Sequence, residues 1–206
     1  YDSDKELIEV GGHAVCEFHL QHKKFDNIIS HVERLNEEQM KAILDMAILY
    51  LDIGDYRELA KAIILRFINS SMDLEFPLAH IFNKEYIKLE DDKKFLQEIM
   101  GSRVSKKIVW SFTHYLEENA LSIVDYADII IKLCENILWM ETEELRNQWG
   151  IEDEISKLII SLYDETANSG KEADREIAEK CLELWDIMFE RQLGSVREIS
   201  RKLMER

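Results

Sequence analysis

Four of the chain's seven glycines recur at a nearly constant interval. Gly54, Gly101, Gly150 and Gly194 stand 47, 49 and 44 residues apart. Each follows an amphipathic run, and a glycine just beyond such a run predicts a helix C-cap, because it tolerates the left-handed backbone that closes a helix. An interval in roughly the mid-forties is the length of one helical hairpin in HEAT and armadillo arrays. The interval therefore predicts stacked helical hairpins.

Proline is nearly absent, since Pro77 is the single example among 206 residues. Because proline breaks helix interiors and populates loops and sheet edges, its scarcity favours long helices with short connections. Apolar residues also recur at helical spacing in almost every segment, as do Leu59, Ile63 and Phe67. We predict an all-α fold, a HEAT/TPR-like α-solenoid of about nine or ten antiparallel helices, in a single helical-repeat domain over residues 1–206.

Polar residues at three positions predict where helices begin. Asn36 and Gln39 have the spacing of a capping box, in which each side chain bonds a free amide of the first turn. Asp55 precedes the next apolar stripe and Ser122 precedes the most regular one, so both are expected as N-caps.

The net charge of −16 constrains the partners of the chain. Nucleic acids and anionic membrane surfaces attract cationic proteins, so we expect neither as a partner. The three cysteines, Cys16, Cys134 and Cys181, all fall within apolar stripes, which is typical of buried thiols in a reduced compartment. There is no apolar run of about 18 residues and no signal peptide. We therefore expect a cytoplasmic location.

Tyr1 stands at the start of the sequence, in mid-pattern and without a methionine. This beginning leads us to expect a fragment of a larger multidomain protein.

Residue types that bind metals gather at one place in the sequence. His13, Cys16, His19 and His22 could share one helix, and Cys16 with His19 could reach a single ion. Structural zinc takes four ligands, however, and no second pair stands at a useful spacing. Surface histidines beside a buried thiol are the favoured interpretation, so we expect no metal and no cofactor.

Catalytic motifs are absent from the sequence. It contains no His-Glu-x-x-His pair, no Walker A loop and no nucleophile elbow, so we expect no enzymatic activity of the chain itself. One basic group stands out, and we interpret it mainly as a solvated helix face, with an anion or acidic-peptide contact as the alternative: Lys93, Lys94, Arg103, Lys106 and Lys107. Trp149, beside a glycine, is the aromatic residue most suspected of exposure, although packing is the favoured role.

Three segments of the last third carry a family resemblance: residues 158–165 (LIISLYDE), 181–188 (CLELWDIM) and 193–199 (LGSVREI). Together they resemble the end of the helical-repeat C-terminal regions of large bacterial STAND NTPases, the class that includes the antiviral Avs proteins. Residues 8–14 and 67–70 are compatible with the same arrays. The resemblance implies a sensor that binds a phage protein, with ATP binding and any effector located upstream of this sequence. A structural scaffold or oligomerisation segment is the alternative.

Residues 69–92 form the least periodic stretch of the chain. If the chain is a sensor, we expect this stretch to be a recognition insert, because Phe76, Phe82 and Tyr86 are aromatic residues of the kind that anchor interfaces. Rings that cap the core between two repeats are the alternative. Trp149 completes the set of expected protein-binding residues.

Overall fold

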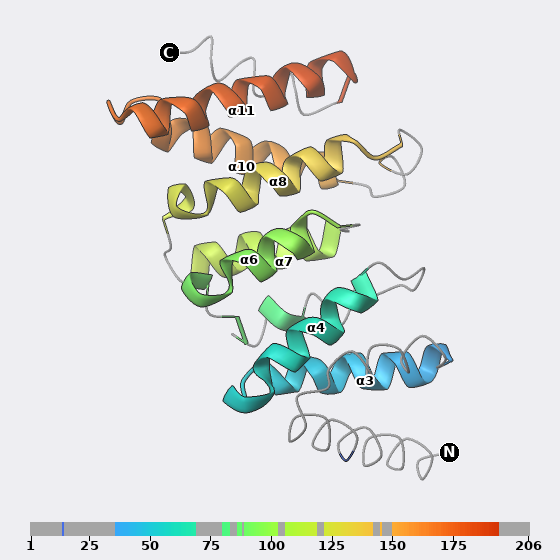
Figure 1. The fold of residues 1–206 in the computed structure, drawn as a ribbon. Helices are drawn as coiled ribbons and strands as arrows, with labels where there is room; N and C mark the ends of the chain where they lie inside the picture. The colour runs from blue at the N-terminus through green and yellow to red at the C-terminus, as the bar shows by residue number, and fades with distance from the viewer. Residues whose placement is uncertain are drawn as a thin grey trace. The chain divides into compact units, whose positions relative to one another are not determined.

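The structure is a computed structural model, and every regular element in the part of the chain that it describes is a helix (Figure 1). The described residues are 36–68, 80–82, 86–87, 89–102, 106–118, 122–141 and 150–193, together with residues 14 and 145. The all-α prediction is therefore confirmed for these residues. The expected total of nine or ten helices refers to the whole chain and stays a prediction.

The chain divides into two compact units, Tyr1–Phe95 and Leu96–Arg206. The division falls within one helix, α6 (Leu89–Met100), whose first seven residues belong to the first unit. The single domain expected over residues 1–206 stays a prediction.

In the first unit, α3 (Glu37–Tyr50) and α4 (Arg57–Ile68) pack against each other and are joined by a short 3-10 helix, η1 (Gly54–Tyr56). The stripe predicted for α4 is confirmed, since Leu59, Ile63 and Phe67 are all buried, together with Ala60, Ile64 and Ile68. Residues Leu44, Ala47 and Leu51 face this core from the preceding segment, together with Ile81, Phe82 and Ile87 from beyond α4. The core positions therefore follow the helical period.

The second unit holds the end of α6 and the helices α7 (Lys106–Glu118), α8 (Ala127–Leu138), α10 (Ile151–Thr166) and α11 (Glu172–Glu190). A 3-10 helix, η2 (Ile123–Tyr126), leads directly into α8. Helices α10 and α11 form a hairpin, joined by the exposed turn 167–171. Helix α10 also packs against α7 and α8, so it lies at the centre of this unit.

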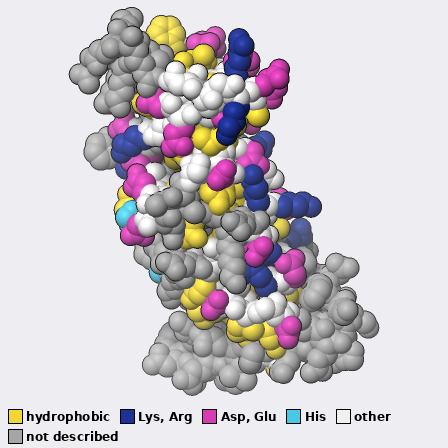
Figure 2. Space-filling model, turned by 90° about the vertical axis from the view of Figure 1, so that its left-hand side faces the viewer, with side chains coloured by type: hydrophobic (Ala, Val, Ile, Leu, Met, Phe, Trp, Pro, Cys, Tyr) yellow, Lys and Arg dark blue, Asp and Glu magenta, His cyan; other side chains and the backbone are white. Residues whose placement is uncertain are grey.

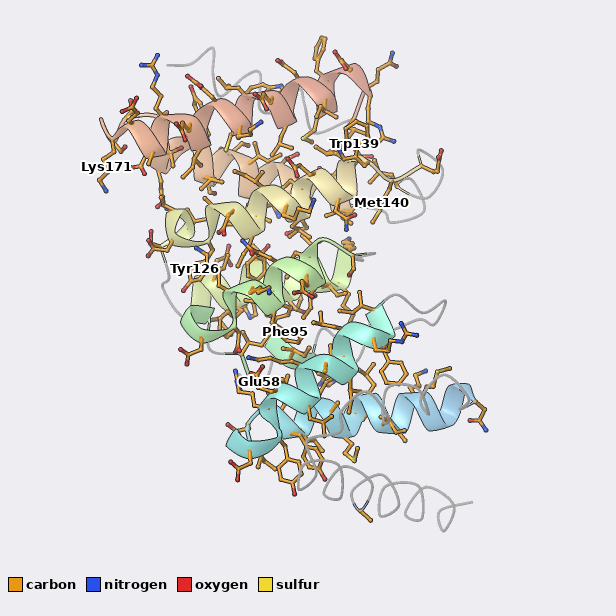
Figure 3. All side chains as sticks on the ribbon, viewed as in Figure 1. Glu58, Phe95, Tyr126, Trp139, Met140 and Lys171 are labelled. Carbon is orange, nitrogen blue, oxygen red and sulfur yellow. The ribbon has the colours of Figure 1, made fainter. Side chains whose placement is uncertain are left out.

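Helices α8 and α11 run in the same direction. Arg191, at the end of α11, donates hydrogen bonds to the carbonyl oxygens of Leu138 and Met140 at the end of α8. In Figure 3, Tyr126 and Lys171 lie at the other ends of the same two helices. The guanidinium group thus satisfies two of the free carbonyls that every helix C-terminus leaves exposed, and it fixes the alignment of α8 with α11.

The apolar stripes of the second unit are mostly buried as the sequence predicts. In α10 the apolar residues Ile155, Leu158, Ile159 and Leu162 recur at helical spacing and are all buried. In α11 the apolar residues Cys181, Leu184 and Met188 are buried, but Leu182 and Phe189, which also recur at helical spacing, are exposed. Periodicity identifies an apolar face of a helix, and it does not say whether a neighbour covers that face.

The glycines do not act as the predicted helix C-caps. Gly150 has a left-handed backbone with φ of 81°, yet it stands at the N-cap of α10 and so begins a helix. Gly54 begins η1, and Gly101 follows α6 without a left-handed φ. Gly194 lies outside the described residues. The glycine spacing thus locates breaks between helices. Of the described left-handed residues, Gly150 and Gly170 come before a helix, whereas Gln192, with φ of 55°, follows the end of α11.

The predicted N-caps also differ from the structure. Asp55 lies inside η1, whose N-cap position is occupied by Ile53, so it does not cap α4. Ser122 does occupy the N-cap position of η2, but its side chain makes no capping hydrogen bond there. The carbonyl of Asn36 accepts the first backbone bond of α3, from the amide of Met40, as the residue before a helix should. A short 3-10 helix therefore precedes each of α4 and α8, and neither of these α-helices starts directly at Asp55 or Ser122.

Candidate functional site

A shallow pocket of about 290 Å³ opens beside α3 in the first unit. Asp45, Ile48 and Leu49 line it from one face of α3, where the helical spacing of three and four residues brings them together. His80 and Tyr86 line it from the segment after α4. The pocket therefore combines aliphatic and aromatic walls with one carboxylate and one imidazole at its edge.

The chain that forms the α3 wall of this pocket continues into a stretch that is both apolar and acidic. Leu49 is 52% exposed, and Ile53, four residues later, is also exposed. Three exposed carboxylates, Asp45, Asp52 and Asp55, lie along the same stretch and form no hydrogen bond or ion pair with any described residue. Figure 2 shows one face of the molecule, on which acidic and basic side chains are interspersed with hydrophobic ones.

One guanidinium group joins the two walls of the pocket. Arg57 donates to the carbonyl oxygen of Leu51, just beyond α3, and to the carbonyl oxygen of Tyr86 at 3.2 Å. The same side chain forms an ion pair with the carboxylate of Asp92 in α6. Because all these bonds come from one planar group, they fix the position of Tyr86 relative to the end of α3.

The carboxylate that holds Arg57 is almost fully buried, since Asp92 is 1% exposed. Lys61 reaches its second oxygen at 2.9 Å and also lies 2.7 Å from Glu58, which Figure 3 labels at the start of α4. Burial acts to lower the pKa of Lys61, but its hydrogen bonds and charge interactions with Glu58 and Asp92 outweigh that effect and raise the pKa. The cluster of two cations and two anions is therefore balanced in charge, which a buried carboxylate requires.

The four expected binding residues differ in where they lie in the structure. Tyr86 is partly exposed and lines the pocket, as an anchoring aromatic residue would. Phe82 is 2% exposed and belongs to the core, so its ring offers no surface to a partner. Phe76 and Trp149 lie outside the described residues.

Sequence reasoning missed two exposed tryptophans in the second unit. Trp110 stacks on His114, one turn later on α7, with the ring centroids 5.2 Å apart. His114 in turn lies 3.0 Å from Glu118, so the three side chains follow each other along one helix face. Trp139 is 77% exposed at the end of α8. Trp110 lies off the stripe of Ile108 and Phe112, a signal that could have identified it.

The two described cysteines do not have the setting of a reactive thiol. Cys134 in α8 and Cys181 in α11 are buried and unpaired. Burial raises the pKa of Cys181 to about 12, and burial together with the nearby Cys181 raises that of Cys134 still further. A thiol that stays protonated is a poor nucleophile and a poor metal ligand.

Within the described ranges, no group of three or more potential ligands among histidine, cysteine and carboxylate side chains comes together. The cluster of His13, Cys16, His19 and His22 lies outside those ranges. No helix in the described part of the chain has the length and apolar character needed to span a bilayer.

Comparison with known proteins identifies no relative of this chain. No family model, no curated protein and no solved structure matches this chain.

Proposed function

We propose that this chain is a protein-binding module that acts by presenting a surface and performs no chemistry of its own. The observation that carries this proposal is the pocket beside α3, where exposed Leu49 and partly exposed Tyr86 form apolar walls. Partly exposed apolar and aromatic side chains around a pocket are the usual anchors of protein interfaces. Arg57, which ties Tyr86 to the end of α3, is itself held by the ion pair with Asp92.

The resemblance to the C-terminal regions of STAND NTPases makes the proposal more specific. It supports a sensor region of a bacterial antiviral defence protein of the Avs type, working in the cytoplasm, with a phage protein as its partner. The rest of its own chain would supply the ATPase, and neither nucleic acid nor a membrane is proposed as a partner. Paired helices such as α10 and α11 are the unit from which a HEAT/TPR-like solenoid would be built.

A structural scaffold or oligomerisation segment is the second candidate, and one observation favours it. Phe189, which is 66% exposed, and Leu182 lie seven residues apart on α11 and therefore on the same helix face. An exposed apolar helix face is typical of a contact with a further protein segment. In this alternative, α11 would contact a neighbouring subunit, with no foreign ligand at the pocket.

Capture from lysates of phage-infected bacteria tests the sensor against the scaffold. The bait is the 206-residue chain, compared with Leu49→Ser at the pocket and with Leu182→Ser on α11 as a matched control. Both substitutions replace an exposed leucine with serine, so each is expected to change stability by only about 0.5 kcal/mol. Equal melting temperatures establish that the three baits are folded alike.

We expect the unmodified chain and Leu182→Ser to retain the same phage protein, and Leu49→Ser to lose it. Retention by all three baits would remove the pocket from the interface while leaving a protein-binding function. Absence of any phage protein from all three baits would contradict the sensor. Self-association that Leu182→Ser abolishes, measured by sedimentation, would then support the scaffold.

A further inference from the structure

The pocket beside α3 differs from an ordinary apolar depression in the charges around it. Asp45 stands at its edge, and Asp52 and Asp55 follow along the chain toward η1. None of the three has an ion-pair partner among the described residues. Arg57 and Lys61, two cations of α4, are bound to Asp92 and Glu58, and Lys41, one turn before Asp45 on α3, forms no ion pair with it.

We propose that the pocket binds a protein segment in which one apolar side chain is flanked by lysine or arginine. This inference rests on the proposed function and adds the chemistry of the partner to it. The apolar side chain contacts Ile48, Leu49 and the ring of Tyr86, and the flanking cations face Asp45 and Asp52. An acidic segment is excluded by repulsion from the same carboxylates.

The size of the pocket suits a side chain better than a free metabolite. Its volume of about 290 Å³ lies at the lower end of the range of roughly 300 to 1,000 Å³ in which small-molecule sites fall. It is also open, and Leu49 on its wall is half exposed. A small molecule would leave much of its surface in water here, whereas a peptide would also contact the protein beyond the pocket.

The apolar contact and the charges contribute in different ways. Pairs between exposed charges contribute at most about 1 kcal/mol each, so most of the affinity must come from burial of the apolar side chain. The carboxylates mainly select the partner and speed its association. Because Arg57 fixes Tyr86 against the end of α3, the apolar walls stand in place before the partner arrives, which lowers the entropic cost of binding.

Selection from a library of random 12-residue displayed peptides tests the inference with the intact 206-residue chain as the target. We expect the enriched peptides to share a leucine, isoleucine, methionine or phenylalanine next to lysine or arginine. The most enriched peptide is then synthesised with a fluorophore, and its affinity is measured by anisotropy. Leu49→Ser should weaken binding by about tenfold or more, as is typical for an anchor contact, and Leu182→Ser should not change it.

The charge contribution is measured with a second pair of variants. Asp45→Asn should weaken binding several-fold at low salt and should flatten its salt dependence, because one partner charge is removed. Asp186→Asn, an exposed aspartate on α11, makes the same change in net charge away from the pocket and serves as the control. Circular dichroism melting confirms that each variant is folded.

Two results would overturn the inference. One is enrichment of peptides without lysine or arginine, which would mean that the carboxylates do not select the partner. The other is unchanged binding by Leu49→Ser, which would place the peptide elsewhere on the chain. In either case, a phage protein captured in the lysate experiment would still leave the proposed function standing.

Discussion

Arg57 and Asp92 form a nearly buried ion pair between α4 and α6, although 35 residues separate them in the sequence. The guanidinium group also binds two backbone carbonyls, at Leu51 and Tyr86. One side chain therefore connects four separate segments of the first unit. Removing it affects the unit's stability and the pocket's geometry together.

Replacement of Arg57 by methionine should destabilise the first unit strongly. It leaves the carboxylate of Asp92 buried and breaks two hydrogen bonds to backbone carbonyls. Loss of one partner from a buried pair costs about 3 to 5 kcal/mol, and we expect the lower end of that range because Lys61 still lies 2.9 Å from Asp92. Urea unfolding followed by circular dichroism measures the change.

Arg175→Met is the matched control for that prediction. Arg175 lies 3.5 Å from Glu179 on α11, but both side chains are exposed, so the pair contributes at most about 1 kcal/mol. Similar losses of stability in the two variants would show that the Arg57–Asp92 pair behaves as a surface pair.

Gly150→Ala and Gly170→Ala should destabilise the second unit by similar amounts. Both glycines have a left-handed backbone, with φ of 81° and 73°, so each substitution incurs a strain of roughly 1 to 2 kcal/mol. A Cβ at residue 150 would also stand 2.8 Å from Nζ of Lys106, but that atom is the far end of a flexible side chain and can move aside at little cost; a Cβ at residue 170 would have no atom within 4 Å. Thermal melting of the two variants measures both losses, and a clearly larger loss for Gly150→Ala would mean that Lys106 is held in place.

Ser111→Ala should stabilise the protein by about 1 kcal/mol. The hydroxyl group of Ser111 is buried in α7 without a hydrogen-bond partner, and alanine removes that unsatisfied group while it favours the helix. Ser156 is the control, because it is also buried but donates to the carbonyl of Glu152 at 2.6 Å. Denaturant unfolding should show a gain for Ser111→Ala that Ser156→Ala lacks, and a loss at both positions would contradict the prediction.

Cys134 and Cys181 should resist thiol reagents in the folded protein. In a Cys16→Ala variant these are the two remaining thiols, and both are buried with a raised pKa. We expect slow reaction with a chromogenic disulfide before unfolding and two equivalents after it. Immediate reaction of either thiol in the folded protein would show that α8 and α11 separate readily.

The same thiols should make the stability fall at alkaline pH. An unfolded cysteine ionises near pH 9, whereas Cys181 in the folded chain has a pKa of about 12. Between these values the folded state binds more protons than the unfolded state, so its stability falls as the pH rises through this window. Cys181→Ala should reduce that slope when unfolding is followed from pH 8.5 to pH 11.

The helices of the described segments were predictable from the sequence, because burial of one apolar face follows the 3.6-residue period, as the six buried residues of α4 show. Their ends were less predictable. Gly150 begins a helix where the pattern predicted an end, since a left-handed residue can stand on either side of a helix boundary.

The candidate site was predictable only in part. Tyr86 was expected at a binding surface and lines the pocket, but Phe82, in the same stretch, is in the core. Phe82 lies in a helical turn and Tyr86 does not, so neither spacing nor composition could separate the two. The ion pair between Arg57 and Asp92 leaves no local signal in the sequence. Charged residues are common in this chain, and pairing over 35 residues depends on the tertiary fold.

The turn 167–171 between α10 and α11 is a place where the chain can accept inserted residues. All five of its residues are exposed, and nothing packs around Gly170. Lengthening such a flexible turn from five residues to twenty would cost only roughly 1.2 kcal/mol in loop-closure entropy, at about 0.6 kcal/mol for each doubling. The α10–α11 hairpin can therefore accept an inserted epitope, a reporter domain or a new evolutionary segment while both helices stay paired.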